Sequence, residues 1–135
     1  MEWNLDDQLC FLLYSNFRKI SRIYQDYLDS YDLTYTQYIT LIVLFEKNHQ
    51  TITDLGKRLH LDSGTLTPLL KKLETKKYVK RVRGIKDERR VYIDLTDKGM
   101  ELKKKLEHVP MNIASHYELN EEEASILQKL LRKTI

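Results

Sequence analysis

Hydrophobic residues recur along residues 5–30 at a spacing that predicts one long helix near the start of the chain. They cover more of the helix surface than a single stripe. The positions are Leu9, Leu12, Leu13, Ile20, Ile23, Tyr27 and Leu28. Because one stripe is enough to pack a helix on the core of its own small domain, we expect this helix to contact a second copy of the chain as well.

Two shorter helices are predicted next, running to about residues 47 and 61. Thr34 and Gln37 have the spacing of a capping box, and an apolar run over residues 38–45 predicts a core helix after them. Thr51 and Asp54 repeat the capping pattern in front of the second helix. The second helix has the place and length of the first helix of a helix-turn-helix.

Residues 61–95 predict an amphipathic helix followed by a basic hairpin. Four leucines fall on one arc of the helix, and the opposite arc is small, hydroxylated and cationic. Such a face suits close approach to phosphates and base edges. Residues 78–83 and 91–95 are then typical of strands around a loop with three basic residues. Because leucine stripes usually pack in cores and basic runs usually face solvent, it is the order of the two elements that favours a winged helix-turn-helix. The leucines are Leu66, Leu69, Leu70 and Leu73.

The start of this recognition helix is ambiguous in the sequence. Asp62, Ser63 or Thr65 can each cap it. Pro68 lacks an N–H, which favours a start at Gly64 or Thr65, or else a slightly irregular first turn. The candidate DNA-contacting residues are Ser63, Gly64, Thr65, Thr67, Pro68, Lys71 and Lys72 on the helix, and Arg83, Lys86, Asp87, Arg89 and Arg90 on the wing.

Two more helices are predicted after the hairpin. Thr96 caps the first, over about residues 97–108, and Pro110 interrupts that helix or follows its end. Asn120 and Glu123 have capping-box spacing at the start of the last helix. The apolar positions of the last helix have no evident partner inside a winged-helix core, so we expect them to take part in dimerisation.

These elements predict a mainly α-helical fold with a small β wing, in one domain over residues 1–135. The winged helix-turn-helix occupies about residues 34–99, and dimerisation helices occupy about residues 5–30 and 100–135. A two-fold dimer would place two recognition helices about one turn of DNA apart on successive faces of the major groove.

Charge and composition limit the kinds of partner that the chain is expected to bind. Residues 71–105 carry 14 Lys and Arg against 6 Asp and Glu, whereas the rest of the chain carries 9 against 14, which predicts a local footprint on a polyanion. No signal peptide or membrane-spanning run is evident, so a cytoplasmic protein without a membrane partner is expected. His49 and His60 are isolated, and we predict neither a metal site nor a cofactor.

Three stretches of the chain resemble MarR-type transcription regulators, over about Gln8 to the C-terminus. Residues 61–74 (LDSGTLTPLLKKLE) and residues 87–89 with 95–99 (DER and LTDKG) are typical of the wider family. Residues 8–14 (QLCFLLY) are similar to the thiol-switch branch, the OhrR/SarZ/MgrA-like proteins, because they place a cysteine near the start of the first helix.

The resemblance implies an obligate homodimer that binds a pseudo-palindromic operator in double-stranded DNA. The recognition helix would enter the major groove. The wing arginine would reach the minor groove, and the matching residue is Arg89, with Asp87 as its orienting carboxylate.

The resemblance also implies a redox-sensing cysteine, which matches Cys10. Tyrosine hydroxyls, some from the partner subunit, would stabilise its thiolate, and the matching positions are Tyr24 and Tyr35, with Tyr14 nearby on the first helix. The thiolate is the form that attacks a peroxide, and the dipole of a helix N-terminus favours an anion.

Cys10 is the one cysteine of the chain, so its sulfenic acid has no second cysteine in the chain to react with. A low-molecular-weight thiol, a cysteine of another protein or overoxidation would complete the reaction. A mixed disulfide near a dimer seam would break the tyrosine contacts and shift the two DNA-binding lobes. By pattern alone, a lone cysteine on an apolar helix is more often a small packed hydrophobe.

Three alternatives remain open from the sequence. A MarR-type regulator released by a small phenolic ligand would leave Cys10 structural. A thiol peroxidase would use Cys10 catalytically, but no Arg and Thr constellation accompanies it, so we expect no enzyme. An RNA-binding winged helix is the third, and the paired dimerisation helices favour duplex DNA over it.

Overall fold

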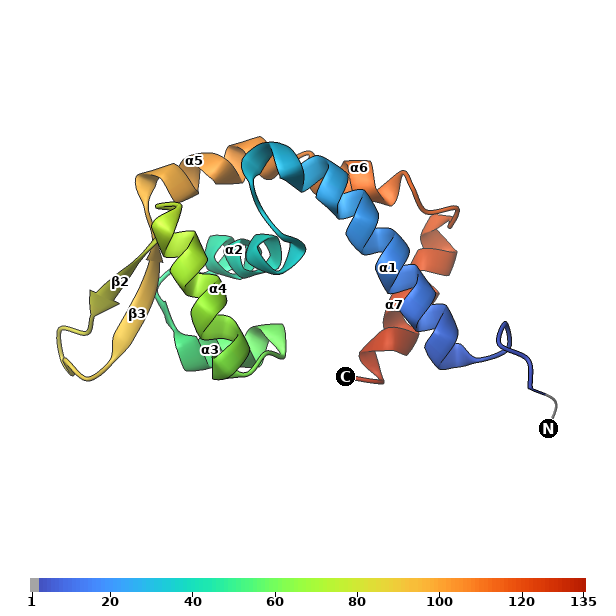
Figure 1. The fold of residues 1–135 in the computed structure, drawn as a ribbon, viewed down its shortest axis with the longest axis horizontal. Coiled ribbons are helices and arrows are strands. Elements are labelled where there is room, and N and C mark those ends of the chain that lie inside the picture. Colours follow the sequence, from blue (N-terminus) through green and yellow to red (C-terminus); the bar gives the residue numbers. More distant parts are fainter. Residues whose placement is uncertain (1–2) are drawn as a thin grey trace.

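The computed structural model describes residues 3–135 and consists mainly of helices with one small sheet, which confirms the predicted fold class (Figure 1). The elements are α1 (Leu9–Leu28), the 3₁₀ turn η1 (Asp29–Tyr31), α2 (Tyr35–Glu46), β1 (Gln50–Thr51), α3 (Ile52–Leu59), α4 (Ser63–Thr75), β2 (Val79–Arg83), β3 (Val91–Leu95), α5 (Asp97–Leu106), α6 (Val109–Ala114) and α7 (Glu121–Arg132).

Side-chain caps start four of the helices where the sequence predicts them. The side chains of Thr34 and Asn120 accept the backbone N–H groups of Gln37 and Glu123. The side chains of Gln37 and Glu123 in turn accept the backbone N–H groups of Thr34 and Asn120, which completes a capping box at each helix. The hydroxyls of Thr51 and Thr96 accept the backbone N–H groups of Asp54 and Gly99. These contacts are local, which is why the sequence alone locates them.

The recognition helix α4 begins one residue before the starts that Pro68 favoured, so that preference was wrong. Asp62 is the N-cap and accepts the Thr65 N–H at 2.7 Å, which leaves Pro68 inside the helix. Proline at this position removes the hydrogen bond to the Gly64 carbonyl. Both Gly64 and Pro68 are exposed, so the free carbonyl lies on the solvent side of α4, where its loss of a partner costs little.

The other predicted boundaries shift by a few residues. The first helix begins at Leu9 rather than residue 5, and its last turn tightens into η1. The helix predicted over residues 97–108 ends at Leu106, and Pro110 lies in the first turn of the separate helix α6. That position suits proline because the first-turn N–H groups have no intrahelical acceptor.

The sheet has the strand order β1-β3-β2, with both pairs antiparallel. In the wing hairpin Val79 pairs with Leu95 and Arg83 with Val91. β1 was missed by the sequence analysis, because two residues are too few to show an alternating pattern. Its pairing of Gln50 with Ile93 joins the wing to the turn after α2.

One core joins the helix-turn-helix to α1, α5 and α6. Its fully buried members include Leu28 of α1, Leu41 and Leu44 of α2, Leu55 of α3, Leu66, Leu70 and Leu73 of α4, and Val109 of α6. Leu102 and Leu106 of α5 are buried in the same cluster. Part of residues 100–135, which the sequence analysis assigned to dimerisation, therefore packs in the core of its own chain.

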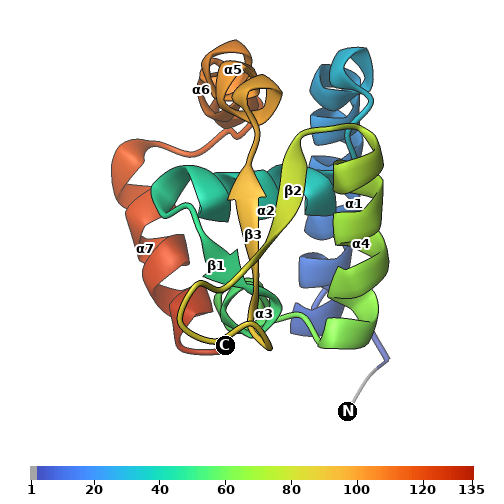
Figure 2. The same ribbon diagram turned by 90° about the vertical axis from the view of Figure 1, so that its left-hand side faces the viewer.

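Two helices leave apolar side chains exposed. α7 has no buried residue, although its apolar positions share one face. In Figure 1, α7 and the first half of α1 lie at the end of the molecule away from the wing, and Figure 2 shows the two helices standing apart. The exposed apolar residues of these helices are Leu9, Leu12, Leu13 and Phe17 on α1, and Ile126, Leu127, Leu130 and Leu131 on α7. Between residues 3 and 135, no helix combines the length and the apolar character that crossing a bilayer requires.

Candidate nucleic-acid interface and thiol site

The recognition helix α4 presents one polar face to solvent because its opposite face is fixed in the core. Leu66, Leu69, Leu70 and Leu73 are all buried. The side chains that sequence analysis assigned to DNA follow the other face. Ser63, Gly64, Thr65, Pro68, Lys71 and Lys72 are exposed, and Thr67 is half-buried.

The first turn of α4 is held by its cap. The Thr65 N–H donates to the Asp62 carboxylate, and this hydrogen bond lowers the pKa of that carboxyl below its ordinary value. The remaining N–H groups of the first turn point out of the helix end with a partial positive charge. Such a helix start is suited to a phosphate oxygen.

The wing loop is ordered by its own backbone and by Asp87. The Gly84 N–H donates to the Arg90 carbonyl at 2.8 Å, and the Arg90 N–H donates to the Asp87 carbonyl at 3.1 Å. A side chain at Gly84 would place its Cβ 2.6 Å from the Asp87 carbonyl oxygen, so the loop requires glycine there. Lys86 is exposed beside these residues.

Asp87 also holds Arg89 at the tip of the wing. The Asp87 carboxylate accepts the Arg89 N–H at 3.0 Å and the Arg89 Nε–H at 3.3 Å. The Arg89 side chain is nonetheless 93% exposed, so its remaining guanidinium N–H groups are free to contact a ligand. Arg83 and Arg90 are also exposed on this hairpin, and so is Ile85, which the sequence analysis did not assign to the interface.

Cys10 is exposed in the first turn of α1. Tyr14 lies one turn further along and is exposed too, and its hydroxyl accepts a hydrogen bond from Arg18 at 3.3 Å. The cysteine and this tyrosine therefore share a solvent-facing part of α1.

Tyr24 and Tyr35 lie together, with ring centroids 4.7 Å apart. Burial raises the pKa of the Tyr24 hydroxyl above its ordinary value, and the neighbouring Tyr38, Tyr35 and Tyr117 raise it further. Burial also raises the pKa of Tyr35. Both phenols therefore stay protonated and can donate a hydrogen bond to an anion.

The sequence analysis missed two members of this tyrosine cluster. The Tyr38 ring lies 5.5 Å from that of Tyr24. Tyr117, from the segment before α7, raises the pKa of Tyr24, and burial together with Tyr35 raises the pKa of Tyr117. Tyr38 follows Tyr35 by three residues on α2, a spacing that places both on one helix face and could have identified it. No local pattern points to Tyr117.

Cys10 and the tyrosine cluster do not meet within one chain. Cys10 and Tyr24 belong to the same helix, and their numbers differ by fourteen, which places them about 21 Å apart along the axis. Any contact between this thiol and the Tyr24 hydroxyl therefore has to cross from one copy of the chain to another.

His49 contacts two side chains of β3. Its Nδ1 lies 2.6 Å from the Asp94 carboxylate, and its ring stacks on Tyr92 with the centroids 4.1 Å apart. Across residues 3–135, no three His, Cys, Asp or Glu side chains cluster as metal ligands would.

Comparison with known proteins identifies similar regulators. The profile of the family described as "Transcriptional regulator SarA/Rot" matches residues 22–106. The HTH-type transcriptional regulator SarZ of Staphylococcus aureus (strain MRSA252) is 45% identical to this chain over 131 residues, which cover 97% of this chain and 88% of SarZ.

Two solved structures extend the likeness to the whole fold. Reduced AbfR bound to DNA has a TM-score of 0.79 and 35% identity, and the match covers 96% of this chain and 92% of AbfR, a protein of Staphylococcus epidermidis. An overoxidized AbfR bound to DNA and a disulfide form of AbfR have been solved as well. Reduced MarR from E. coli has a TM-score of 0.79 and 27% identity over 100% of this chain and 99% of MarR.

Proposed function

This chain belongs to the SarA/Rot family of transcriptional regulators, within the wider MarR group of winged-helix proteins, and on that premise we propose that it is a homodimeric, redox-switched operator-binding protein. In this proposal reduced protein binds a pseudo-palindromic DNA duplex, and oxidation of Cys10 releases it. The observation that supports DNA binding most strongly is that the start of α4 and the wing loop lie on the same side of the molecule.

Figures 1 and 2 place the start of α4 and the loop between β2 and β3 on the same side of the molecule. The polar face of α4 would lie in the major groove, with Lys71 and Lys72 on phosphates. The exposed Arg89 guanidinium, oriented by Asp87, would reach the adjacent minor groove. DNA-bound AbfR supports this assignment, because it shares the fold at 35% identity.

Arg89→Ala is expected to weaken operator binding by roughly 1–3 kcal/mol, because it removes a guanidinium contact in the groove. Fluorescence anisotropy with a labelled duplex measures the change. Arg132→Ala, which removes an exposed arginine from α7, is the matched control and should bind as the wild type does. Equal affinities for all three proteins would exclude the wing tip from the interface.

Lys71→Ala and Lys72→Ala are each expected to reduce the slope of log affinity against log salt by about 0.9, because each lysine neutralises one phosphate. Anisotropy titrations at several salt concentrations give the slope. Lys104→Ala removes a lysine from α5, which lies on the other side of the molecule from the wing tip in Figure 1, and should keep the wild-type slope. A wild-type slope in the α4 variants would place these lysines off the DNA.

The homodimer is supported by the apolar side chains that α1 and α7 expose. Phe17 and Leu130 are each more than half exposed, and α7 buries none of its residues in its own chain. Large apolar surfaces of this kind mark association sites. A second copy would cover these faces and would also bring a Tyr24 and Tyr35 pair within reach of Cys10.

The switch is supported by the chemistry around Cys10. The exposed thiolate would attack an organic hydroperoxide, which gives cysteine sulfenic acid and an alcohol. A low-molecular-weight thiol would then displace water from the sulfenic acid and form a mixed disulfide. The added group would break the contacts with protonated Tyr24, Tyr35 and the nearby Tyr14, and the two DNA-binding lobes would change their spacing.

The test is anisotropy on an AT-rich palindromic duplex, with wild type and Cys10→Ser compared. Reduced forms of both should bind. One equivalent of organic hydroperoxide with a small thiol should release the wild type alone, and mass spectrometry should find the thiol on Cys10. If both proteins bind the duplex with the same affinity before and after the oxidant is added, the switch is rejected and the DNA interface stands. Failure of both reduced proteins to bind any duplex would reject the proposal as a whole.

A hollow along α1 favours a second candidate, release by a phenolic ligand. It measures about 540 Å³ and combines apolar rings with basic groups, which suits an aromatic anion. Its lining includes Phe11, Tyr14, Arg18, Arg22 and His116. Cys10→Ser that still leaves DNA when a phenolic acid is added would support this candidate, and unchanged binding would reject it.

A further inference from the structure

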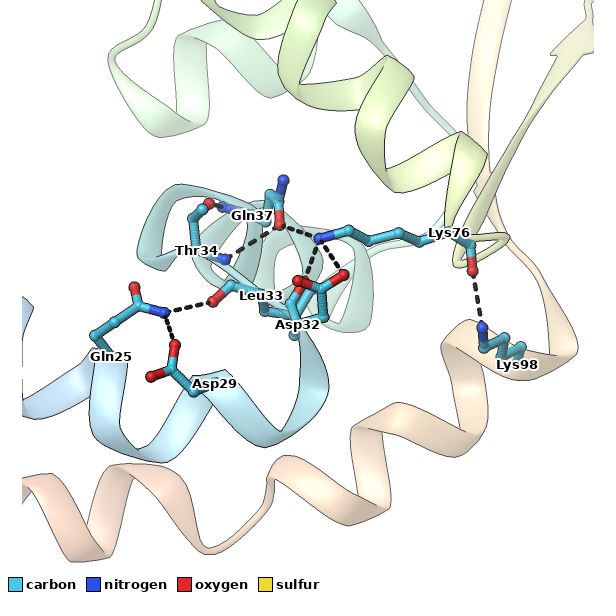
Figure 3. Close-up of polar contacts among 8 residues, drawn as sticks. All are labelled: Gln25, Asp29, Asp32, Leu33, Thr34, Gln37, Lys76 and Lys98. Carbon is cyan, nitrogen blue, oxygen red and sulfur yellow. Dashed lines mark hydrogen bonds and ion pairs between the residues drawn. The ribbon is translucent and has the colours of Figure 1, made fainter.

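The corner between α1 and α2, residues 29–34, is held by polar contacts from both of its flanking helices (Figure 3). The Gln25 amide donates to the Leu33 carbonyl at 3.3 Å and also to the Asp29 carboxylate. At the other side of the corner, the Gln37 side-chain oxygen accepts the backbone N–H of Thr34 at 3.1 Å. The corner therefore has a defined shape and follows the end of α1.

Asp32, in the middle of this corner, has left-handed backbone torsions with φ 53°. Few side chains adopt this region easily, and aspartate and asparagine are among those that do. The Asp32 side chain is 92% exposed, although its carboxylate faces Lys76 at the end of the recognition helix. The backbone carbonyl of Asp32 faces the same lysine (Figure 3).

Lys76, the C-cap of α4, bridges from the recognition helix to this corner. Its ammonium donates to the Asp32 carbonyl and to Gln37 Oε1 at 3.2 Å, and the Asp32 carboxylate lies 3.6 Å away. The Lys76 side chain is only 24% exposed, and Gln37 is 3% exposed. The contact with Gln37 is therefore partly shielded from water, whereas the contacts with Asp32 are exposed.

The main chain of Lys76 is bound from a third element. The Lys98 ammonium of α5 donates to the Lys76 carbonyl at 2.9 Å (Figure 3). The Thr96 hydroxyl donates to the neighbouring Lys77 carbonyl at 2.5 Å. The end of α4 is thus fixed to α5 through its backbone and to the α1–α2 corner through one side chain.

We propose that Lys76 is a positioning residue that couples α1 to the recognition helix. A rotation of α1 displaces Asp32, and the Lys76 ammonium carries that displacement to the end of α4. This inference rests on the proposed function, because it gives the path by which a change at the dimer helix reaches the DNA contact. Lys76 itself need not touch DNA.

The exposed ion pair is the weaker part of this bridge. A carboxylate in water contributes little to such a contact. The buried Gln37 Oε1 is the stronger part, because an acceptor shielded from water loses more when its donor is removed. The Asp32 carbonyl is the acceptor that joins the lysine to the corner. This distinction separates two substitutions: Lys76→Met removes the donor and keeps the length of the side chain, whereas Asp32→Asn keeps both acceptors and tolerates the same φ.

The first test measures operator affinity in the reduced and oxidised states, well below each protein's melting temperature. Lys76→Met is expected to bind about tenfold more weakly when reduced, the equivalent of one hydrogen bond to a charged group. The ratio between reduced and oxidised affinities should fall as well, which a merely stabilising contact would not cause. Lys76→Arg should recover part of the reduced-state affinity and part of the ratio. Asp32→Asn and the control Lys104→Met should match the wild type.

Two results of this test would overturn the inference. One is a wild-type affinity and ratio in Lys76→Met. The other is an equal loss in Asp32→Asn, since that would assign the coupling to the exposed carboxylate.

Amide hydrogen exchange tests the bridge without DNA or oxidant, so it decides even if the proposed function fails. In Lys76→Met, the amides of residues 33–38 and of residues 76–78 should both exchange about tenfold faster than in the wild type. In Lys104→Met, neither segment should exchange faster. Faster exchange at the end of α4 alone, or at neither segment, would show that the lysine does not hold the corner.

Discussion

Leu130→Asp is expected to convert the proposed dimer into monomers. Leu130 is 53% exposed on the apolar face of α7, and in a dimer that face would be buried. A carboxylate there would have to lose its water without gaining a partner. Sedimentation should give the mass of one 16.2 kDa chain. Operator affinity should fall by roughly 10²–10⁴, because the two half-sites are no longer engaged together.

Ser125→Asp is the matched control for that substitution. It adds the same charge to the same helix, but Ser125 lies on the polar face of α7, away from the apolar stripe. This variant should keep the mass and the operator affinity of the wild type. A Leu130→Asp protein with twice the chain mass at low concentration would remove α7 from the proposed interface.

Leu70→Ala is expected to reduce the free energy of unfolding by about 2–5 kcal/mol, because it leaves a cavity under the recognition helix. Leu70 is 1% exposed and lies in the cluster that joins α4 to α2 and β2. Urea unfolding followed by circular dichroism measures the loss, at one protein concentration so that association does not confound the comparison.

Leu5→Ala supplies the comparison for Leu70→Ala, since it makes the same deletion at an exposed residue before α1. Its free energy of unfolding should stay within about 0.5 kcal/mol of the wild type. If the two variants lost similar amounts, the polar face of α4 would not owe its orientation to the buried leucine face.

The candidate DNA interface was largely predictable from the sequence, because its features are local. The four leucines at helical spacing decide which face of α4 is buried, and so which face carries Lys71 and Lys72 to solvent. Asp87 and Arg89 are two residues apart, and their contact needs only the short wing loop. The one local error, the start of α4, arose because the Asp62 cap outweighs the bond that Pro68 removes.

The thiol site was less accessible to sequence reasoning. The sequence places Cys10 near a helix start and, through its family likeness, associates it with Tyr24 and Tyr35. The fold brings the two tyrosines together, adds Tyr38 and Tyr117 to them, and keeps Cys10 at the far end of α1. Contacts between residues so far apart depend on how helices pack, and no short pattern records that packing.

Local sequence patterns were enough to predict four helix caps, the two faces of α4, the wing hairpin and the concentration of positive charge over residues 71–105. Each depends on side chains within a few positions of one another, where backbone geometry fixes the outcome. Three features became evident only from the folded chain: β1 joins the sheet, α5 and α6 belong to the core, and Lys76 reaches the corner after α1. Those features depend on residues brought together by burial of the common core, which stabilises the chain without leaving a local pattern in the sequence.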